Sequence, residues 1–204
     1  MSQATFSKIV KSKIINYWET KLREEALELT SIPYFKPNFM SLTEPHPIWS
    51  ACGSSPFECH KAVIAARMLS GRYLTDSLQG HWTQNKEGVC LLPACASSKV
   101  YGNLEHLILF CPSLSQTRQK LLSLVNKISM EHESLQYILQ ESFHTNDYRD
   151  QMQLLLDCTS IPSVIYLTQM FGPSLQDRLL YLGRTWCYCI HHDRMNQLGL
   201  LKFR

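Results

Sequence analysis

Four residues near the middle of the chain have the side chains and the spacing to bind a metal ion. Cys90, Cys95, His106 and Cys111 follow the pattern C-x4-C-x10-H-x4-C. Three thiolates and one imidazole complete the tetrahedral coordination that Zn²⁺ prefers and leave no open position for water. The spacing therefore predicts one structural zinc ion. The alternative is a chance spacing of four unrelated residues, since lone cysteines are commonly small core residues.

The local sequence favours the bends that such a site requires. Pro93 lies in the short spacer between the first two cysteines, where it allows a turn. His106 is expected on a short helix that starts at Leu104, and Cys111 is about 140° further around an ideal helix. The helix should therefore end before Cys111. Pro112 favours this end, because a residue that precedes proline avoids helical backbone angles.

Basic and aromatic residues beside the predicted site could bind nucleic acid. Zn²⁺ with three thiolates is negatively charged, so phosphates would have to contact the flanking residues. The candidates are Lys86, Lys99, Arg118 and Lys120 for phosphates, and Trp82 or Tyr101 for base stacking. The loop with Lys99 and Tyr101 is the best single candidate.

A second such surface is expected on the last helix. Tyr181, Arg184, Tyr188 and His191 recur every three or four residues and would share one helix face. The segment 173–204 has a local excess of positive charge. The alternative is a half-buried helix edge, from which the arginines extend their head groups to water.

The remaining cysteine and histidine residues offer a weaker second metal site. Cys187 and His191 would be neighbours on a helix, but a helix supplies only two such ligands. Cys59 or Cys158 would then have to complete the site from elsewhere in the fold. Buried thiols are the better interpretation.

The composition is that of a globular intracellular protein. The 204 residues include 20 Lys+Arg and 17 Asp+Glu, and the net charge of +3 does not by itself indicate nucleic-acid binding. We expect no signal peptide and no transmembrane segment, and hence a nuclear or cytoplasmic location where disulfides are disfavoured. The sequence has no Walker loop, G-x-G-x-x-G motif or nucleophile elbow, so we expect neither an enzyme nor a small-molecule substrate.

Helical periodicity predicts an all-α fold, a helical bundle-like domain with a central zinc-stapled Cys-Cys-His-Cys loop. Residues 1–54 should form an N-terminal helix and a proline-rich connection, residues 55–130 the helices that flank the zinc knuckle (83–112), and residues 131–204 a C-terminal helical region. The expected helices cover about 6–30, 55–70, 113–129, 146–157, 162–170 and 175–198, with one more around 135–139. Ser55-Pro56-Phe57-Glu58 carries the signals of a helix start and capping box.

Several short runs resemble a known protein family. Lys61 to Tyr73, Thr75-Asp76 and His81-Trp82 lead into the cysteines, and Leu104-Glu105-His106-Leu107, Cys111-Pro112 and Arg118 follow. This pattern resembles the segment downstream of the polymerase in reverse transcriptases of LINE-like non-LTR retrotransposons. Pro45 to Trp49, Leu155 to Asp157 and Arg184 to Tyr188 are also similar to that family, so the resemblance spans about residues 40–200.

The resemblance implies a zinc knuckle, with Cys90, Cys95, His106 and Cys111 as ligands, that handles RNA or target DNA. The polymerase Asp-Asp pair and the endonuclease have no counterpart, so catalysis is not implied, although a reverse transcriptase could act in trans. We therefore expect a non-catalytic zinc module that binds RNA or single-stranded nucleic acid. The alternatives are a structural or protein-interaction domain whose zinc only stabilises the fold, or a retroelement remnant without a selected function.

Overall fold

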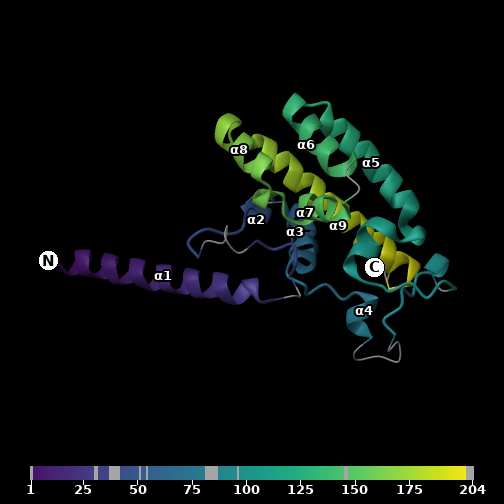
Figure 1. Cartoon of the computed structure of the whole chain (residues 1–204), viewed down its shortest axis with the longest axis horizontal. Helices are drawn as coiled ribbons and strands as arrows, with labels where there is room; N and C mark the ends of the chain where they lie inside the picture. The colour runs from purple at the N-terminus through teal and green to yellow at the C-terminus, as the bar shows by residue number, and fades with distance from the viewer. Residues whose placement is uncertain are drawn as a thin grey trace.

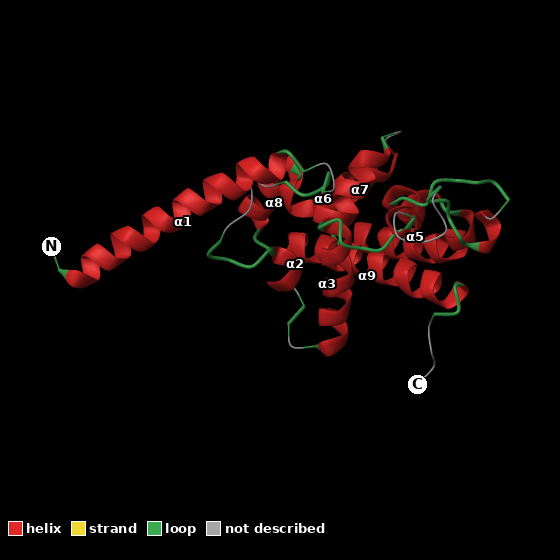
Figure 2. Cartoon of the chain, turned by 90° about the horizontal axis from the view of Figure 1, so that it is seen from below, coloured by secondary structure: helices red, strands yellow, loops and turns green. Residues whose placement is uncertain are grey.

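The computed structural model of the chain is an assembly of helices (Figure 1). It describes residues 2–29, 32–36, 42–50, 52–53, 55–80, 87–95, 97–144 and 147–200. Within these ranges there is no strand, only an isolated antiparallel bridge between Val89 and Tyr101, and Figure 2 shows helices joined by loops. The predicted all-α fold is confirmed.

Most of the described helices lie where they were predicted, but the short helix α2 (Pro47–Ser50) falls in the segment expected to be a proline-rich connection. The described helices are α1 (Gln3–Leu27), α2 (Pro47–Ser50), α3 (Pro56–Leu69), α4 (Asp76–Gln79), α5 (Ser115–Ser129), α6 (Glu133–His144), α7 (Tyr148–Asp157), α8 (Pro162–Phe171) and α9 (Ser174–Gln197). Short turns η2 (Pro93–Cys95), η3 (His106–Phe110), η4 (Pro112–Leu114) and η5 (Cys158–Ser160) connect some of them. Two of these turns, η2 and η3, carry two of the predicted metal ligands, Cys95 and His106, and Cys111 lies between η3 and η4.

The start of α3 shows how the local sequence sets a helix boundary. Ser55 Oγ accepts a hydrogen bond from the backbone N–H of Glu58 at 3.4 Å, and Pro56 occupies the first helical position. Half of the predicted capping box is therefore present. The Glu58 carboxylate does not complete it, because it pairs with Lys61 Nζ at 2.7 Å.

The long helix α9 lies at the centre of the core and packs against α3, α5, α7 and α8. Leu179, Leu182, Trp186 and Ile190 recur every three or four residues on α9 and are buried on one face of the helix. At Gly183 the backbone of α7 comes so close that an added Cβ would lie 2.3 Å from the Leu155 carbonyl oxygen. Only glycine permits this approach, so α7 and α9 are in direct backbone contact.

Helix α1 differs from the others because it projects from the body (Figure 1). Phe6, Ile14 and Trp18 on this helix are roughly half exposed. Its described contact with the connection to α2 includes a hydrogen bond from the Leu42 backbone N–H to Glu19 Oε1 at 2.8 Å. Most of its apolar side chains therefore contribute little to the core.

One described helical run, Tyr148–Phe171, has the length and apolar composition of a membrane span. It comprises α7, η5 and α8, and its side chains Met152, Leu154 and Leu155 belong to the hydrophobic core. The length and composition are weak evidence for a span, because a core helix of a folded domain has the same properties.

Candidate metal centre

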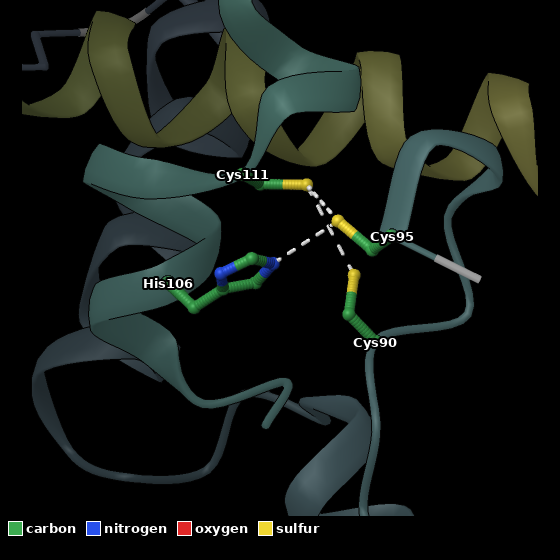
Figure 3. Close-up of side chains that lie close together, drawn as sticks. All are labelled: Cys90, Cys95, His106 and Cys111. Atoms are coloured by element: carbon green, nitrogen blue, oxygen red, sulfur yellow. Dashed lines mark hydrogen bonds between the residues drawn. The ribbon is translucent and has the colours of Figure 1, made fainter. Parts of the chain in front are cut away.

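The structure brings the four predicted ligands together in one buried cluster (Figure 3). Their ligand atoms all lie within 4.8 Å of one another. Cys95 Sγ is 3.5 Å from Cys111 Sγ and 3.4 Å from His106 Nε2, and Cys90 Sγ is 4.0 Å from Cys111 Sγ. Tetrahedral zinc would set such atoms about 3.8 Å apart for two sulfurs and about 3.6 Å for sulfur and nitrogen. The cluster therefore has the dimensions to hold a metal ion.

The two halves of the cluster come from different backbone elements. Figure 3 shows Cys90 and Cys95 on a loop at one side and His106 and Cys111 on a helical segment at the other. The Cys90 N–H donates to the Val100 carbonyl at 2.8 Å, which closes a hairpin-like loop around η2. The loop and the helical segment thus supply two predicted ligands each, and the two pairs face each other.

A widened helical turn brings His106 and Cys111 onto the same side. The Cys111 N–H donates to the His106 carbonyl at 2.6 Å, five residues back, so that η3 is a π-helical turn. In such a turn residue i+5 lies roughly one turn after residue i. Cys111 itself has left the helix, with φ −58° and ψ 117°, as the following Pro112 predicts. The helix end is confirmed, but the π turn was not predicted.

Side-chain hydrogen bonds fix the ends of both halves. Asn103 Oδ1 accepts from the His106 N–H at 2.9 Å, where the helical segment begins. Ser113 Oγ accepts from the Ala94 N–H at 2.9 Å and so joins the cysteine loop to η4. These bonds hold the ligand positions through residues that the ligand spacing alone does not identify.

Burial makes the cluster unfavourable for free thiolates. The pKa of Cys90 is raised because its thiol donates to Cys111 and because it is buried, and burial also raises the pKa of Cys95. The hydrogen bond from Cys90 lowers the pKa of Cys111. A metal cation bound at this point would compensate the charge of all three thiolates. The donor set and its environment therefore suit a soft divalent ion.

Arg118 contacts the backbone of the metal cluster and is only partly exposed to solvent. Its Nη2 donates to the Cys111 carbonyl oxygen, and burial lowers the pKa of the guanidinium despite the opposing effect of Cys111 and Cys95. A half-buried cation at this position offsets part of the negative charge of the thiolates. This structural contact adds to the phosphate-binding role predicted for Arg118, which stays a prediction.

A buried ion pair connects the cysteine loop to the core. Arg194 Nη2 lies 2.9 Å from Asp76 Oδ1, and both side chains are almost fully buried. Asp76 Oδ2 accepts from the Leu91 N–H, next to Cys90, at 3.4 Å. At Gly102 an added Cβ would lie 2.8 Å from Asp76 Cβ, so the loop packs closely on this carboxylate. Sequence reasoning missed the pair, because Asp76 and Arg194 are 118 residues apart.

The predicted nucleic-acid loop is exposed beside the metal cluster. Tyr101 is 55% exposed, and Lys99 is exposed with a left-handed backbone angle φ of 48°. Lys99 Nζ is 3.9 Å from Glu87 Oε2, a contact between two exposed groups. Lys120 is exposed on α5, whereas Lys86 and Trp82 lie outside the described residues.

The residues predicted on α9 are not equally accessible. Tyr181 and Tyr188 are half-buried at the surface. Arg184 is only 2% exposed, and its Nη1 donates to the Ile48 carbonyl at 3.2 Å, so its role in nucleic-acid binding is corrected to a structural one. His191 Nδ1 lies 3.1 Å from Tyr73 Oη, and burial lowers the His191 pKa to about 4. His191 is therefore neutral near pH 7 and supplies no positive charge.

Among the described residues, the Cys90–Cys111 cluster is the only group of three or more Cys, His, Asp or Glu side chains arranged to hold a metal. Cys158 and Cys187 are fully buried thiols, and burial raises the pKa of Cys187 to about 12. These two cysteines fill space in the core.

No protein-family model, curated protein or solved structure matches this chain.

Proposed function

We propose that the protein is a non-catalytic module in which one structural Zn²⁺ ion is held by Cys90, Cys95, His106 and Cys111. The buried, four-donor cluster is the observation that carries the proposal. Four protein donors fill tetrahedral zinc and leave no position for a substrate or an activated water, as a catalytic site would require. None of the eight cysteines forms a disulfide, which suits an intracellular, reducing compartment.

The module is further proposed to bind RNA or single-stranded nucleic acid through the loop that follows η2. Lys99 and Tyr101 are both exposed there, and the loop is anchored between two pairs of metal ligands. An exposed cation beside an exposed ring can bind a phosphate and stack on a base. The resemblance to LINE-like reverse transcriptases supports this partner, and a reverse transcriptase acting in trans would supply any catalysis.

An oligonucleotide titration tests the nucleic-acid role. Fluorescence anisotropy with labelled single-stranded RNA and DNA should show affinity that falls steeply between 50 and 200 mM salt, by roughly tenfold for each two phosphates contacted. The double variant Lys99→Asn with Tyr101→Ala should bind about tenfold more weakly. Asn is chosen because it tolerates the left-handed backbone at residue 99.

A matched control removes an exposed lysine and an exposed tyrosine elsewhere. Lys127 on α5 is exposed and Tyr137 on α6 is 62% exposed, so their double replacement by Ala should leave affinity unchanged. If the wild-type protein fails to bind at low salt, the nucleic-acid role is wrong.

A protein-interaction domain is the second candidate function, and the projecting helix α1 favours it. Phe6, Ile14 and Trp18 present apolar surface to solvent on this helix. Such exposure is common at protein interfaces. A folded, zinc-loaded protein that binds neither RNA nor single-stranded DNA would favour this function.

A further inference from the structure

Side-chain rings gather at the surface where α3 crosses α9. Tyr188 of α9 is in contact with three of them: its ring centroid lies 5.2 Å from Phe57, 5.8 Å from His60 and 5.9 Å from His192. Phe57 is 52% exposed, and both histidines are exposed. We call Phe57, His60, Tyr188 and His192 the ring cluster. Its outer rings keep much of their surface in solvent and do not fill the core.

Basic side chains lie beside the ring cluster. Lys61 Nζ lies over the Phe57 ring at 4.7 Å and over the Tyr181 ring at 5.1 Å. The carboxylate at this seam, Glu58, is paired with both Lys61 at 2.7 Å and Arg184 at 3.8 Å. The Lys61 ammonium is therefore held against the Phe57 ring.

An exposed basic side chain lies next to the rings. Arg67 is exposed two turns after His60 on the same face of α3. On α9, the carboxylate of Asp193 is turned toward α5, where it accepts a hydrogen bond from Thr117. Arg67 therefore gives this surface an accessible positive charge.

We propose that the ring cluster is a stacking platform for single-stranded nucleic acid, with bases on Phe57, His60 and His192 and phosphates near Arg67. This inference rests on the proposed nucleic-acid function, but it assigns a surface distinct from the Lys99–Tyr101 loop. Rings stack on any base, and a positive surround attracts the phosphates between them. Sequence reasoning included Tyr188 but not Phe57, His60 or His192, because the cluster combines two helices that are distant in the chain.

The composition of the ring cluster favours nucleic acid over an apolar partner. Phe57 is its one purely apolar member, and the other three rings carry a hydroxyl or ring nitrogens. A lipid surface or a hydrophobic peptide would require contiguous aliphatic surface. Polar rings beside cations match bases and phosphates instead.

The test uses the full zinc-loaded chain and a labelled single-stranded 12-mer, studied as DNA and as RNA by anisotropy. Phe57→Ala combined with His192→Ala should weaken binding at least tenfold, since each lost stacking contact weakens binding by about fivefold or more. Arg67→Ala should weaken binding of all sequences and reduce the salt slope by about one. Circular dichroism and zinc content confirm that the variants remain folded.

A second exposed ring pair provides the matched control. His132 and Phe171 are in edge-to-face contact at 5.5 Å, away from the α3–α9 seam, and Phe171 is 54% exposed. Their replacement by Ala should leave affinity unchanged. A 5-iodouracil oligonucleotide should also crosslink to the ring cluster under ultraviolet light, which tests the surface without a substitution.

The outcomes separate this inference from the function on which it rests. If the wild-type chain binds and the Phe57→Ala/His192→Ala variant binds equally well, with crosslinks elsewhere, the ring cluster is not the platform and the module still binds nucleic acid. If the wild-type chain does not bind at low salt, the proposed function and this inference both fail.

Discussion

The metal-ligand segment, residues 90–111, and the packed pair α7 and α9 both bury their central side chains, but their contacts differ in kind. Leu155 and Trp186 are 2% exposed in a surround of apolar side chains, and the two backbones touch at Gly183. Cys95 and Cys111 are 0% exposed, yet they meet other sulfurs and an imidazole. Apolar burial stabilises the helices directly, whereas buried thiolates require a cation. Without bound metal, the helical core should therefore stay folded, whereas the ligand segment should lose its structure.

Metal removal should separate the two regions most strongly. Structural zinc contributes about 10–16 kcal/mol of binding free energy in small zinc domains. After chelation, amide hydrogen exchange in residues 88–111 should become fast, while α7 and α9 stay protected. Equal protection of residues 88–111 with and without metal would contradict the proposed structural role.

Asp76→Asn should weaken the connection between the two regions. The change leaves Arg194 buried without its carboxylate, and loss of one partner of a buried pair costs about 3–5 kcal/mol. Zinc affinity should also fall by roughly 10–100-fold, because Asp76 supports the Leu91 backbone beside Cys90. Chemical denaturation and competition with a zinc indicator measure the two effects.

The matched control for Asp76 is Asp157→Asn. Asp157 is a buried carboxylate at the end of α7 that accepts from the Thr159 N–H and lies 3.5 Å from His46 Nε2, outside the ligand loop. Its replacement should leave zinc affinity unchanged. If both variants bind zinc as the wild type does, Asp76 has no supporting role at the metal cluster.

Gly183→Ala should affect the helical core alone. Its Cβ would overlap the Leu155 carbonyl oxygen at 2.3 Å, so α7 and α9 must move apart. Overpacking of this kind destabilises proteins by about 1–3 kcal/mol. The denaturation midpoint should fall while zinc affinity is retained. If zinc affinity also fell, the two regions would not be independent.

The smallest expected effect is a pH dependence that arises from His191. Burial lowers its folded-state pKa from 6.5 to about 4, so the unfolded chain takes up the proton first as the pH falls. His191 therefore reduces stability as the pH falls from about 6.5 towards 4, and has no such effect above that window. With allowance for its partial exposure, the effect should be about 1–2 kcal/mol.

His191→Gln isolates this contribution. Protonation of the metal ligands affects both proteins equally, so the difference in their unfolding free energies reports His191. That difference should change between pH 6.5 and 4 and stay constant above pH 7. A difference independent of pH would mean that His191 titrates alike in the folded and unfolded chains.

Local patterns in the sequence predict the helices and the ligand set. Ser55 and Pro56 mark the start of α3, and the apolar spacing from Leu179 to Ile190 predicts the buried face of α9. The four side chains of the candidate metal cluster are identified by residue type and spacing alone. These features can be predicted because each depends on neighbours within one or two turns or on known coordination chemistry.

Features that depend on distant segments could not be predicted in the same way. The Asp76–Arg194 pair and the Tyr188 contact with Phe57 join residues more than a hundred positions apart. Periodicity places Arg184 on a basic face, but only the packing of α2 and α3 shows that it is buried. The π turn from His106 to Phe110 also contacts a distant segment, because Trp186 Nε1 of α9 donates to the Ile108 carbonyl at 3.4 Å.

The zinc content of the purified chain tests the central claim most directly. Elemental analysis should find one zinc per wild-type chain and much less in Cys95→Ser, which removes a ligand. Cys59→Ser, at a half-buried thiol outside the cluster, should keep one zinc per chain. A wild-type protein without stoichiometric zinc, or a Cys95→Ser variant that retains it, would contradict the account.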